Sequence, residues 1–392
     1  MKAAFFHDNL FKKYKGDYYT DTDLSFDFLK NYLEYFDNLK IVAREEEIDD
    51  LDLKKFGKSS AENISFDCTK AIGIKTYFSG YLNRLVKKNV SESDFSIIRL
   101  PSIMGIIACA ACRKQKKPYL VEVVADAFYV HWYHGNKFFK ILSFPIEFLV
   151  RREIKKAPHV MYVSKYLKTK YKTEGDNVVV SDVRIKKAEK SVFAKAVSRI
   201  DQYTDKTTYK IGLIGSLDVV YKGHKEAIKA TRLVREAGIN IEMHFLGQLS
   251  DTSREKWTQL AEKEGVRDYI FFDGTRPSGE GVKTWLEDMD VFILPSYTEG
   301  LGRSIIEAMN VGLPCLGSDT GGVPELIEKA ALFTPKSEKS LAEALIKVLK
   351  NKDELKELVA WSEARVEDFD REKLTKAREA YYKKIGLEKK NA

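Results

Sequence analysis

Two glutamates, Glu299 and Glu307, stand in the part of the chain that is richest in residues able to do chemistry. The first precedes the turn Gly300-Leu301-Gly302, and the second lies in a segment with helical periodicity. Eight positions on an ideal helix advance about 12 Å along its axis, which is too far for a close pair of acid and base. If Glu299 lies in the loop and Glu307 in the helix, the two carboxylates can hold two ends of one extended ligand.

Apolar runs on both sides of the glutamates predict buried strands. Residues 291–294 end directly before the loop, residues 304–309 have helical character, and a second strand-like run covers 313–317. Parallel sheets bind ligands at the carboxyl ends of their strands. A helix N-terminus behind a glycine loop also presents free backbone N–H groups to an anion. The order strand, loop, helix, strand therefore predicts an anion site in this loop.

A lysine upstream occupies a similar position. Lys222 comes shortly after the glycine turn 212–215, which follows a strand-like run from residue 209, and a helix is expected to begin near Gly223. Such a cation can stabilise negative charge on a phosphate group. The alternative is a solvated lysine, although a helix N-terminus is an unfavourable place for a structural cation.

These segments resemble the signature of family 4 of the retaining glycosyltransferases. The most specific match covers residues 295–327, PSYTEGLGRSIIEAM with the stretch that follows it. Residues 209–234 are similar to the family's strand, loop and helix with its Lys-Gly pair, and a weaker match covers 157–171. The resemblance implies the GT-B architecture, in which two Rossmann-like parallel-sheet domains face each other across a cleft.

The resemblance also implies an activity. Members of the family move a sugar from a nucleotide-sugar donor to an acceptor and retain the configuration at the anomeric carbon. We expect a hexosyltransferase that uses a UDP- or GDP-sugar and needs neither a cofactor nor a metal ion, because the sequence has no Asp-x-Asp motif with metal-ligand context. The expected acceptor is a glycan or lipid-linked glycan of the cell envelope or capsule. Two alternatives stay open: a non-catalytic subunit that binds a sugar nucleotide or a partner enzyme, and an epimerase or phosphorylase with this fold.

The roles of single residues follow from their positions in the family motifs. Lys222 is expected to bind the donor diphosphate, Glu299 the hydroxyls of the donor sugar and Glu307 the ribose. Without the resemblance, Glu307 would be interpreted as a surface helix carboxylate and the loop 300–302 as a tight turn. The expected donor-binding residues are Gly215, Ser216, Lys222, Arg276, Glu299, Gly300, Leu301, Gly302, Arg303 and Glu307.

One position departs from the family pattern. Many relatives carry an arginine after the glycine at position 215, and this chain has Ser216, which can donate one hydrogen bond but brings no charge. We hypothesise that Arg303, a cation at the start of the Glu307 helix, partly replaces that arginine. The alternative is a surface arginine.

The candidate residues for the acceptor site are chosen because they follow the ends of predicted strands. Asp126 follows the apolar run 119–125 and is the predicted residue near the reacting centre, with His134 as a second candidate. His7 and Asp8 follow the first strand and are expected to face the cleft. The predicted catalytic set is therefore Lys222, Glu299, Asp126 and Arg303.

Composition limits the class of protein. The chain has 392 residues, of which 44% are apolar, and a net charge of +8, which suits phosphate-bearing ligands or an anionic membrane surface. It shows no nucleic-acid-binding module, no secretory signal at the start and no apolar stretch of about 18 residues. The four cysteines lack framework spacing, and the pair Cys109 and Cys112 is expected to pack inside a helix. We therefore expect a cytoplasmic protein.

Basic and apolar residues mix in the segment 137–156. It is either a helix packed in the N-terminal domain and kinked at Pro145, or a segment that docks on an anionic membrane and serves a lipid-linked acceptor. In the second case the protein works at the inner face of the plasma membrane.

Alternating strand and helix patterns predict two α/β domains. In the first domain they predict a strand over 2–6 with a loop after it, and helices over 23–36, 75–88, 103–115 and 139–156, with another that begins near residue 164. The predicted N-terminal acceptor domain covers 1–190, and a polar stretch without strand character, 191–206, is the expected linker. The nucleotide-sugar domain is expected over 207–368. Residues 369–392 are expected to form a helix that crosses back to the first domain, as the resemblance implies.

Overall fold

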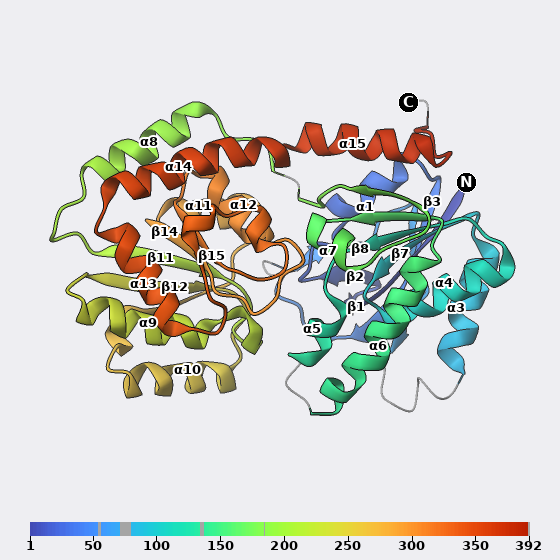
Figure 1. The fold of residues 1–392 in the computed structure, drawn as a ribbon. Coiled ribbons are helices and arrows are strands. Elements are labelled where there is room, and N and C mark those ends of the chain that lie inside the picture. The colour runs from blue at the N-terminus through green and yellow to red at the C-terminus, as the bar shows by residue number, and fades with distance from the viewer. Residues whose placement is uncertain (54–55, 71–79, 134–136, 184, 391–392) are drawn as a thin grey trace.

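The computed structural model describes residues 1–53, 56–70, 80–133, 137–183 and 185–390 (Figure 1). Two α/β halves lie side by side, each built around a sheet of mainly parallel strands with helices on its faces, which is the predicted fold class. None of the helices within these ranges is long and apolar enough to cross a membrane.

The C-terminal sheet has six parallel strands in the order β13-β12-β11-β14-β15-β16. The chain builds the sheet outward from β11 in one direction and then returns to add β14 on the other side. The carboxyl ends of β11 and β14 therefore flank the switch point, where such sheets bind ligands. The strands are β11 (Tyr209–Ile214), β12 (Ile241–Leu246), β13 (Ile270–Gly274), β14 (Val291–Leu294), β15 (Cys315–Ser318) and β16 (Leu332–Phe333).

Amphipathic helices cover this sheet. Each buries an apolar face, as in α9, where Ala227, Ile228 and Val234 are fully buried. The helices of this half are α8 (Lys190–Asp201), α9 (His224–Glu236), α10 (Asp251–Lys263), α11 (Glu280–Glu287), α12 (Arg303–Asn310), α13 (Glu338–Leu349) and α14 (Lys352–Val366), with the 3-10 turns η1 (Val220–Lys222), η2 (Arg267–Tyr269), η3 (Val323–Glu325), η4 (Lys329–Ala331) and η5 (Glu367–Phe369).

The N-terminal sheet follows the same plan. Its parallel core runs β10-β9-β8-β7-β1, and β3 lies on the other side of β1. The carboxyl ends of β1 and β7 flank its switch point and are turned toward the other half. The strands are β1 (Lys2–Tyr14), β2 (Asp17–Thr20), β3 (Asn38–Glu47), β4 (Gly57–Lys58), β5 (Ile64–Phe66), β6 (Thr69–Lys70), β7 (Phe95–Leu100), β8 (Tyr119–Val123), β9 (His159–Tyr162) and β10 (Asp176–Val179).

Strand β1 is longer than the predicted strand over residues 2–6. It shifts register against β3 between Phe6 and Leu10, continues to Tyr14 and turns into an antiparallel hairpin with β2. The residues after His7, expected to form a loop, are therefore mostly strand. Phe11 in this extension is fully buried, whereas Lys12, Lys13 and Tyr14 are only partly buried, so the extension lies at the margin of the core.

The helices of the N-terminal half agree with the prediction except at α5, which was not predicted. They are α1 (Phe26–Leu33), α3 (Tyr81–Glu92), α4 (Ile103–Gln115), α5 (Ala127–Trp132), α6 (Lys137–Lys155) and α7 (Lys165–Lys170). The helix predicted over 75–88 falls partly outside the described residues. Cys109 and Cys112 are buried free thiols in α4, and burial raises the pKa of Cys112 to about 11, so packing is their role.

The stretch predicted as a linker, 191–206, contains most of helix α8. Phe193 and Ile200 are buried against the C-terminal half, where Arg199 pairs with Asp290 at 2.6 Å and α8 packs on α14. The linker prediction missed this helix because its large buried residues, Phe193 and Ile200, are few and stand among small, polar and charged ones, although they fall on one helical face.

The chain passes between the halves at two adjacent places. Ile185 pairs with Asp370 in a parallel bridge, and the Asp370 carboxylate accepts the Lys187 N–H at 3.0 Å. Helix α15 (Arg371–Lys384) then runs across the top of the molecule and packs on the N-terminal half (Figure 1). There the Tyr381 hydroxyl donates to the Asp176 carbonyl at 2.8 Å, and Tyr382 is buried.

Candidate active site

Lys222 and Glu299 meet at the switch point of the C-terminal sheet. Lys222 ends the turn η1 after β11, and Glu299 lies in the loop after β14. The Lys222 ammonium donates to Glu299 Oε1 at 2.7 Å, and the Ser296 hydroxyl donates to the same oxygen at 2.7 Å. Only 19% of the Lys222 side chain and 14% of the Glu299 side chain are exposed. Lys222 and Glu299, which are expected to bind the diphosphate and the sugar of the donor, thus lie in direct contact.

Two glycines allow the loops of β11 and β14 to approach this closely. Gly223 has a φ of 80°, and a Cβ there would lie 2.2 Å from the Pro295 carbonyl oxygen. A Cβ on Gly215 would lie 2.9 Å from the side chain of Lys222. A larger residue at either position would displace Lys222 from Glu299.

The surroundings keep Lys222 charged. Burial acts to lower the pKa of Lys222, but the Glu299 carboxylate outweighs burial and the pKa is raised overall. His224, two residues later, is fully buried at the start of α9, and burial followed by the Lys222 charge lowers its pKa to about 3. At neutral pH this corner of the site therefore holds one ammonium group beside a neutral imidazole.

The other glutamate lies on a different wall of the site. Helix α12 begins after Gly302, whose φ of 98° places it in the left-handed region, and Glu307 lies one turn into the helix. Glu307 and Arg303 both line a cavity of about 980 Å³ between the two halves. Burial raises the pKa of Glu307, and the Arg303 charge opposes that rise. The loop that starts at Glu299 therefore connects the ion pair to this cavity.

Arg303 forms an ion pair with Asp23, which lies between β2 and α1 in the N-terminal half. Burial acts to lower the pKa of Arg303, but Asp23 and Asp182 outweigh burial and raise it. The Ser216 hydroxyl, on the loop after β11, accepts the Asp218 N–H at 3.3 Å. The hypothesis that Arg303 replaces a missing arginine at position 216 stays a prediction.

The remaining donor-binding candidates take different positions. The Leu301 side chain is buried in the core, so only its backbone can reach a ligand. Gly322 donates its N–H to the Glu299 carbonyl at 3.2 Å, which shows that the Gly321-Gly322 turn supports the loop. Arg276 is exposed after β13, in a loop that continues to cavity-lining residues at 278 and 279.

The prediction that Asp126 acts near the reacting centre conflicts with its geometry. Asp126 caps helix α5 by accepting the N–H groups of Phe128 and Tyr129, and its other oxygen accepts from Tyr166 and Lys170. Its side chain is 1% exposed. Because every contact is internal to the N-terminal half, Asp126 positions α5 and is not available to an acceptor.

Of the other acceptor candidates, Asp8 is also engaged inside the N-terminal half. The Asp8 carboxylate accepts the N–H groups of Ile103 at 2.6 Å and Met104 at 3.0 Å, at the start of α4. Burial lowers the pKa of His7 to about 3, so this imidazole is neutral. Asp8 is thus engaged at the start of α4, the expectation that His7 and Asp8 face the cleft stays a prediction, and His134 lies outside the described residues.

Contacts between the halves surround the loop at Glu299. A Cβ on Gly300 would lie 2.4 Å from the Val124 carbonyl oxygen, at the end of β8. The ring of Tyr133, at the end of α5, packs on Tyr297 with centroids 5.4 Å apart, and the Lys336 ammonium lies 4.7 Å from the Tyr133 ring. The loop is therefore held by both halves.

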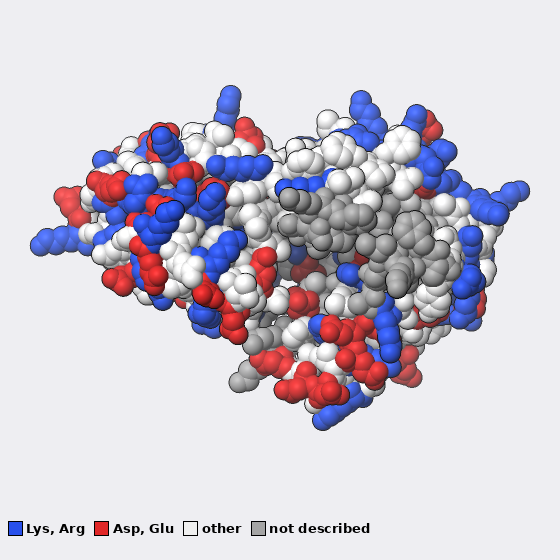
Figure 2. All heavy atoms as spheres, turned by 90° about the horizontal axis from the view of Figure 1, so that it is seen from below, with Lys and Arg blue, Asp and Glu red and all other residues white. Residues whose placement is uncertain are grey.

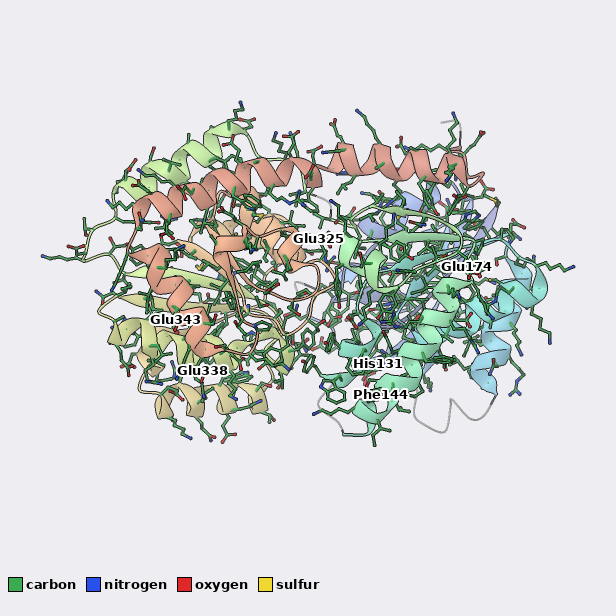
Figure 3. The ribbon with its side chains drawn as sticks, viewed as in Figure 1. His131, Phe144, Glu174, Glu325, Glu338 and Glu343 are labelled. Carbon is green, nitrogen blue, oxygen red and sulfur yellow. The ribbon has the colours of Figure 1, made fainter. Side chains whose placement is uncertain are left out.

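Glu325 makes a further contact that the sequence did not reveal. Its carboxylate accepts the backbone N–H groups of Lys165 and Tyr166, at the start of α7 in the other half. Figure 3 shows Glu325 on the side of the C-terminal half that faces its neighbour. Asp23, Tyr133 and Glu325 all act across the boundary between halves, and no local pattern distinguishes such residues. Only the position of Glu325 inside the matched stretch 295–327 pointed toward the site.

A metal site is not formed by the part of the chain that the structure describes: no group of three or more His, Cys, Asp or Glu side chains lies close enough together to hold an ion. The polar groups that converge on the site are one lysine, one arginine, two glutamates and the backbone of a glycine loop. This set can bind an anion beside a group rich in hydroxyls.

Known proteins share both the sequence and the fold. Residues 197–365 match the family model "Glycosyl transferases group 1". Protein CapJ of Staphylococcus aureus is 33% identical over 98% of this chain and 96% of its own length. The "putative colanic acid biosynthesis glycosyltransferase WcaL" of Escherichia coli K12 is 35% identical over 38% of this chain and 39% of its length.

Among solved structures, Anabaena Alr3699/HepE in complex with UDP and glucose superposes with a TM-score of 0.65 and 16% identity, over 98% of this chain and 100% of that chain. The likeness shows the same two-domain fold. The full-length relative, the family match over the C-terminal half and the shared fold agree with one another. The chain therefore belongs to the glycosyl transferases group 1 family and has the GT-B fold.

Proposed function

We propose that this glycosyltransferase moves a sugar from a UDP-sugar to a glycan acceptor, with retention at the anomeric carbon and without a metal ion. The observation that carries the proposal is the pair Lys222 and Glu299 at the sheet's switch point, connected by one loop to Glu307 on the cavity wall. A carboxylate for the sugar, a cation for the diphosphate and a carboxylate for the ribose are together the groups that a nucleotide sugar requires.

Lys222 would bind the diphosphate in this arrangement. The negative charge on the β-phosphate grows as the bond to the sugar breaks, so a fixed cation beside it lowers the barrier. The backbone N–H groups at the start of α12, which have no side-chain cap, would add to this stabilisation. Arg303, released from Asp23, would supply a second positive charge.

The proposed reaction needs no protein base. The acceptor hydroxyl attacks the anomeric carbon on the face from which the UDP departs, the bond to the β-phosphate oxygen breaks, and that oxygen takes the hydroxyl proton. This route agrees with Asp126 and Asp8 being engaged inside the N-terminal half. Glu299 would hold the donor sugar through its hydroxyls.

The acceptor is proposed to be a capsular or cell-envelope polysaccharide under construction, carried on a lipid. The support comes from WcaL, whose name assigns it to colanic acid synthesis, and from full-length similarity to CapJ. Nucleotide sugars are made in the cytoplasm, so we place the protein there, at the inner face of the plasma membrane. The UDP moiety is proposed because the structurally similar HepE binds UDP.

A panel of UDP- and GDP-sugars tests the donor. A ligand at about 100 times its Kd stabilises the folded state by about 2.7 kcal/mol, which a thermal shift detects easily. We expect a UDP-sugar to raise the unfolding midpoint, to be hydrolysed slowly alone and to yield a product with the donor's anomeric configuration. Binding without hydrolysis or transfer would favour a non-catalytic subunit, and an inverted product would exclude the retaining mechanism.

A further inference from the structure

Three large apolar side chains stand out from helix α6 on one face. Ile141 is 70% exposed, Phe144 61% and Phe148 66%. Their spacing of three and four residues places them next to one another along the helix. Single exposed apolar residues are common on protein surfaces, but a contiguous ridge of this kind marks an interaction surface.

The ridge is not needed to hold α6 in place. The opposite face of the helix buries Ile146, Val150 and Ile154 in the core of the N-terminal half. Helix α5 extends the ridge, because the Phe144 ring contacts Phe128 at a centroid distance of 5.2 Å and Trp132 at 6.1 Å. Figure 3 shows Phe144 at the lower end of α6, near His131 of α5.

Basic side chains surround the ridge. Arg152 and Lys155 are exposed further along the same helical face, Lys140 and Arg151 lie beside it, and the Lys140 ammonium lies 5.7 Å from the Trp132 ring. In the view from below, uncharged side chains gather over the upper part of the half that carries α5 and α6, and Asp and Glu gather over its lower part (Figure 2).

Acidic groups offset only part of this charge, since Lys155 pairs with the exposed Glu174 at 3.3 Å. Between residues 140 and 155 the helix carries two acids. Glu153 is fully buried between Arg113 and Arg152, and Glu147 pairs with Arg151 at 2.7 Å. The exposed face is therefore apolar along its middle and positive at its margins, which is the composition of a helix that lies on an anionic bilayer.

We propose that α5 and α6 form a docking surface for an anionic lipid membrane, with Ile141, Phe144 and Phe148 inserted among the acyl chains and Lys140, Arg152 and Lys155 at the headgroups. A second copy of the chain fits this face poorly, because a symmetric contact would place the same basic residues opposite one another. The surface adjoins the proposed active site, since Tyr133 at the end of α5 packs on Tyr297. Docking would therefore bring the cleft to the lipid surface. The lipid-linked acceptor rests on the proposed function, whereas the docking surface does not.

Vesicle flotation tests the surface directly with the full chain. We expect the protein to float with vesicles of phosphatidylcholine and phosphatidylglycerol, to float much less with phosphatidylcholine alone, and to be partly released by high salt. Phe144→Ser with Phe148→Ser should weaken binding on the order of tenfold or more. The matched control is Leu53→Ser, at a residue that is 59% exposed outside the surface, and it should float like the parent.

Two results would overturn the proposal. One is a parent protein that stays unbound to anionic vesicles. The other is flotation that the double variant leaves unchanged. If the parent instead forms a dimer that the double variant dissolves, the face belongs to a second copy and the membrane assignment fails. Thermal shift with UDP-sugars on the same variants keeps the two proposals apart, because donor binding should be equal in all of them.

Discussion

At the scale of single residues, Lys222 and Glu299 serve both stability and the proposed chemistry, and the two roles can be separated. Lys222→Met leaves a largely buried carboxylate without its cation, which should cost about 1–3 kcal/mol of unfolding free energy. Adding Glu299→Gln removes the unpaired charge and should restore most of that stability. Turnover should fall about 100-fold or more in the single and the double variant, because the phosphate-binding cation is absent from both.

Denaturant unfolding and steady-state kinetics measure the two effects side by side. Lys229→Met is the matched control, since Lys229 on α9 pairs with Glu338 at the start of α13 at 3.4 Å, away from the loop, and its turnover should match that of the parent. Recovery of activity together with stability in the double variant would reduce Lys222 to a structural role.

Arg303 carries a separate prediction. If it supplies a charge that Ser216 lacks, Arg303→Ala should lower donor affinity and turnover about tenfold, whereas Asp23→Asn, which frees Arg303, should keep or raise donor affinity. Titration calorimetry with UDP measures the affinity of both variants for the donor nucleotide, and steady-state kinetics measure their turnover. The hypothesis is wrong if Arg303→Ala leaves donor affinity and turnover unchanged while Lys222→Ala abolishes them.

His224 predicts a pH dependence of stability. Its folded pKa is lowered to about 3 by burial and by the Lys222 charge, below the usual value of 6.5. As the pH falls, His224 is protonated in the unfolded chain before it is protonated in the folded protein. Its contribution to the free energy of unfolding is therefore complete above pH 6.5 and is lost as the pH falls toward 3. By about pH 5 the loss should reach roughly 2 kcal/mol.

His224→Phe should remove this part of the acid sensitivity, because neither ring nitrogen has a partner and the ring packs on Phe245. Urea unfolding at a series of pH values measures it. If the free energy of unfolding fell equally with pH in the parent and in the variant, His224 would not be the source of this acid sensitivity.

At the scale of elements, the loop between β14 and α12 joins the halves at Gly300. Gly300→Ala would place a Cβ 2.4 Å from the Val124 carbonyl oxygen, so the loop or the two halves must move apart. A misplacement of about 1 Å in an active site can cost about 100-fold. We expect kcat/KM to fall by at least tenfold while the unfolding midpoint changes little, as thermal melts and kinetics will show. Unchanged kinetics would mean that this contact does not position the loop.

The elements around the site were predictable because their signals are local. The strand before Glu299, the glycine turn and the helix carrying Glu307 follow from apolar runs and glycine positions in one stretch. Helix α8 was missed because its buried residues, Phe193 and Ile200, stand among charged ones. The extension of β1 was missed because its partner β2 comes from beyond a turn, and pairing decides strands of that kind.

At the scale of the whole molecule, the contacts between the two halves could not be predicted from the sequence. The fold followed from the resemblance, but Asp126 and Asp8 looked accessible at strand ends and are instead engaged by helices packed beside them. The partners Asp23 of Arg303 and Glu325 of α7 are distant in sequence, so only the assembled structure pairs them. The two crossings between the halves are likewise distant in sequence and meet in the bridge between Ile185 and Asp370.

A crystal structure with a bound UDP-sugar is the most direct measurement of the central claim. The account predicts the β-phosphate within about 3 Å of Lys222 Nζ and of a backbone N–H at the start of α12, with the ribose hydroxyls on Glu307. A diphosphate bound elsewhere, with the Lys222–Glu299 ion pair and the loop after β14 undisturbed, would contradict it.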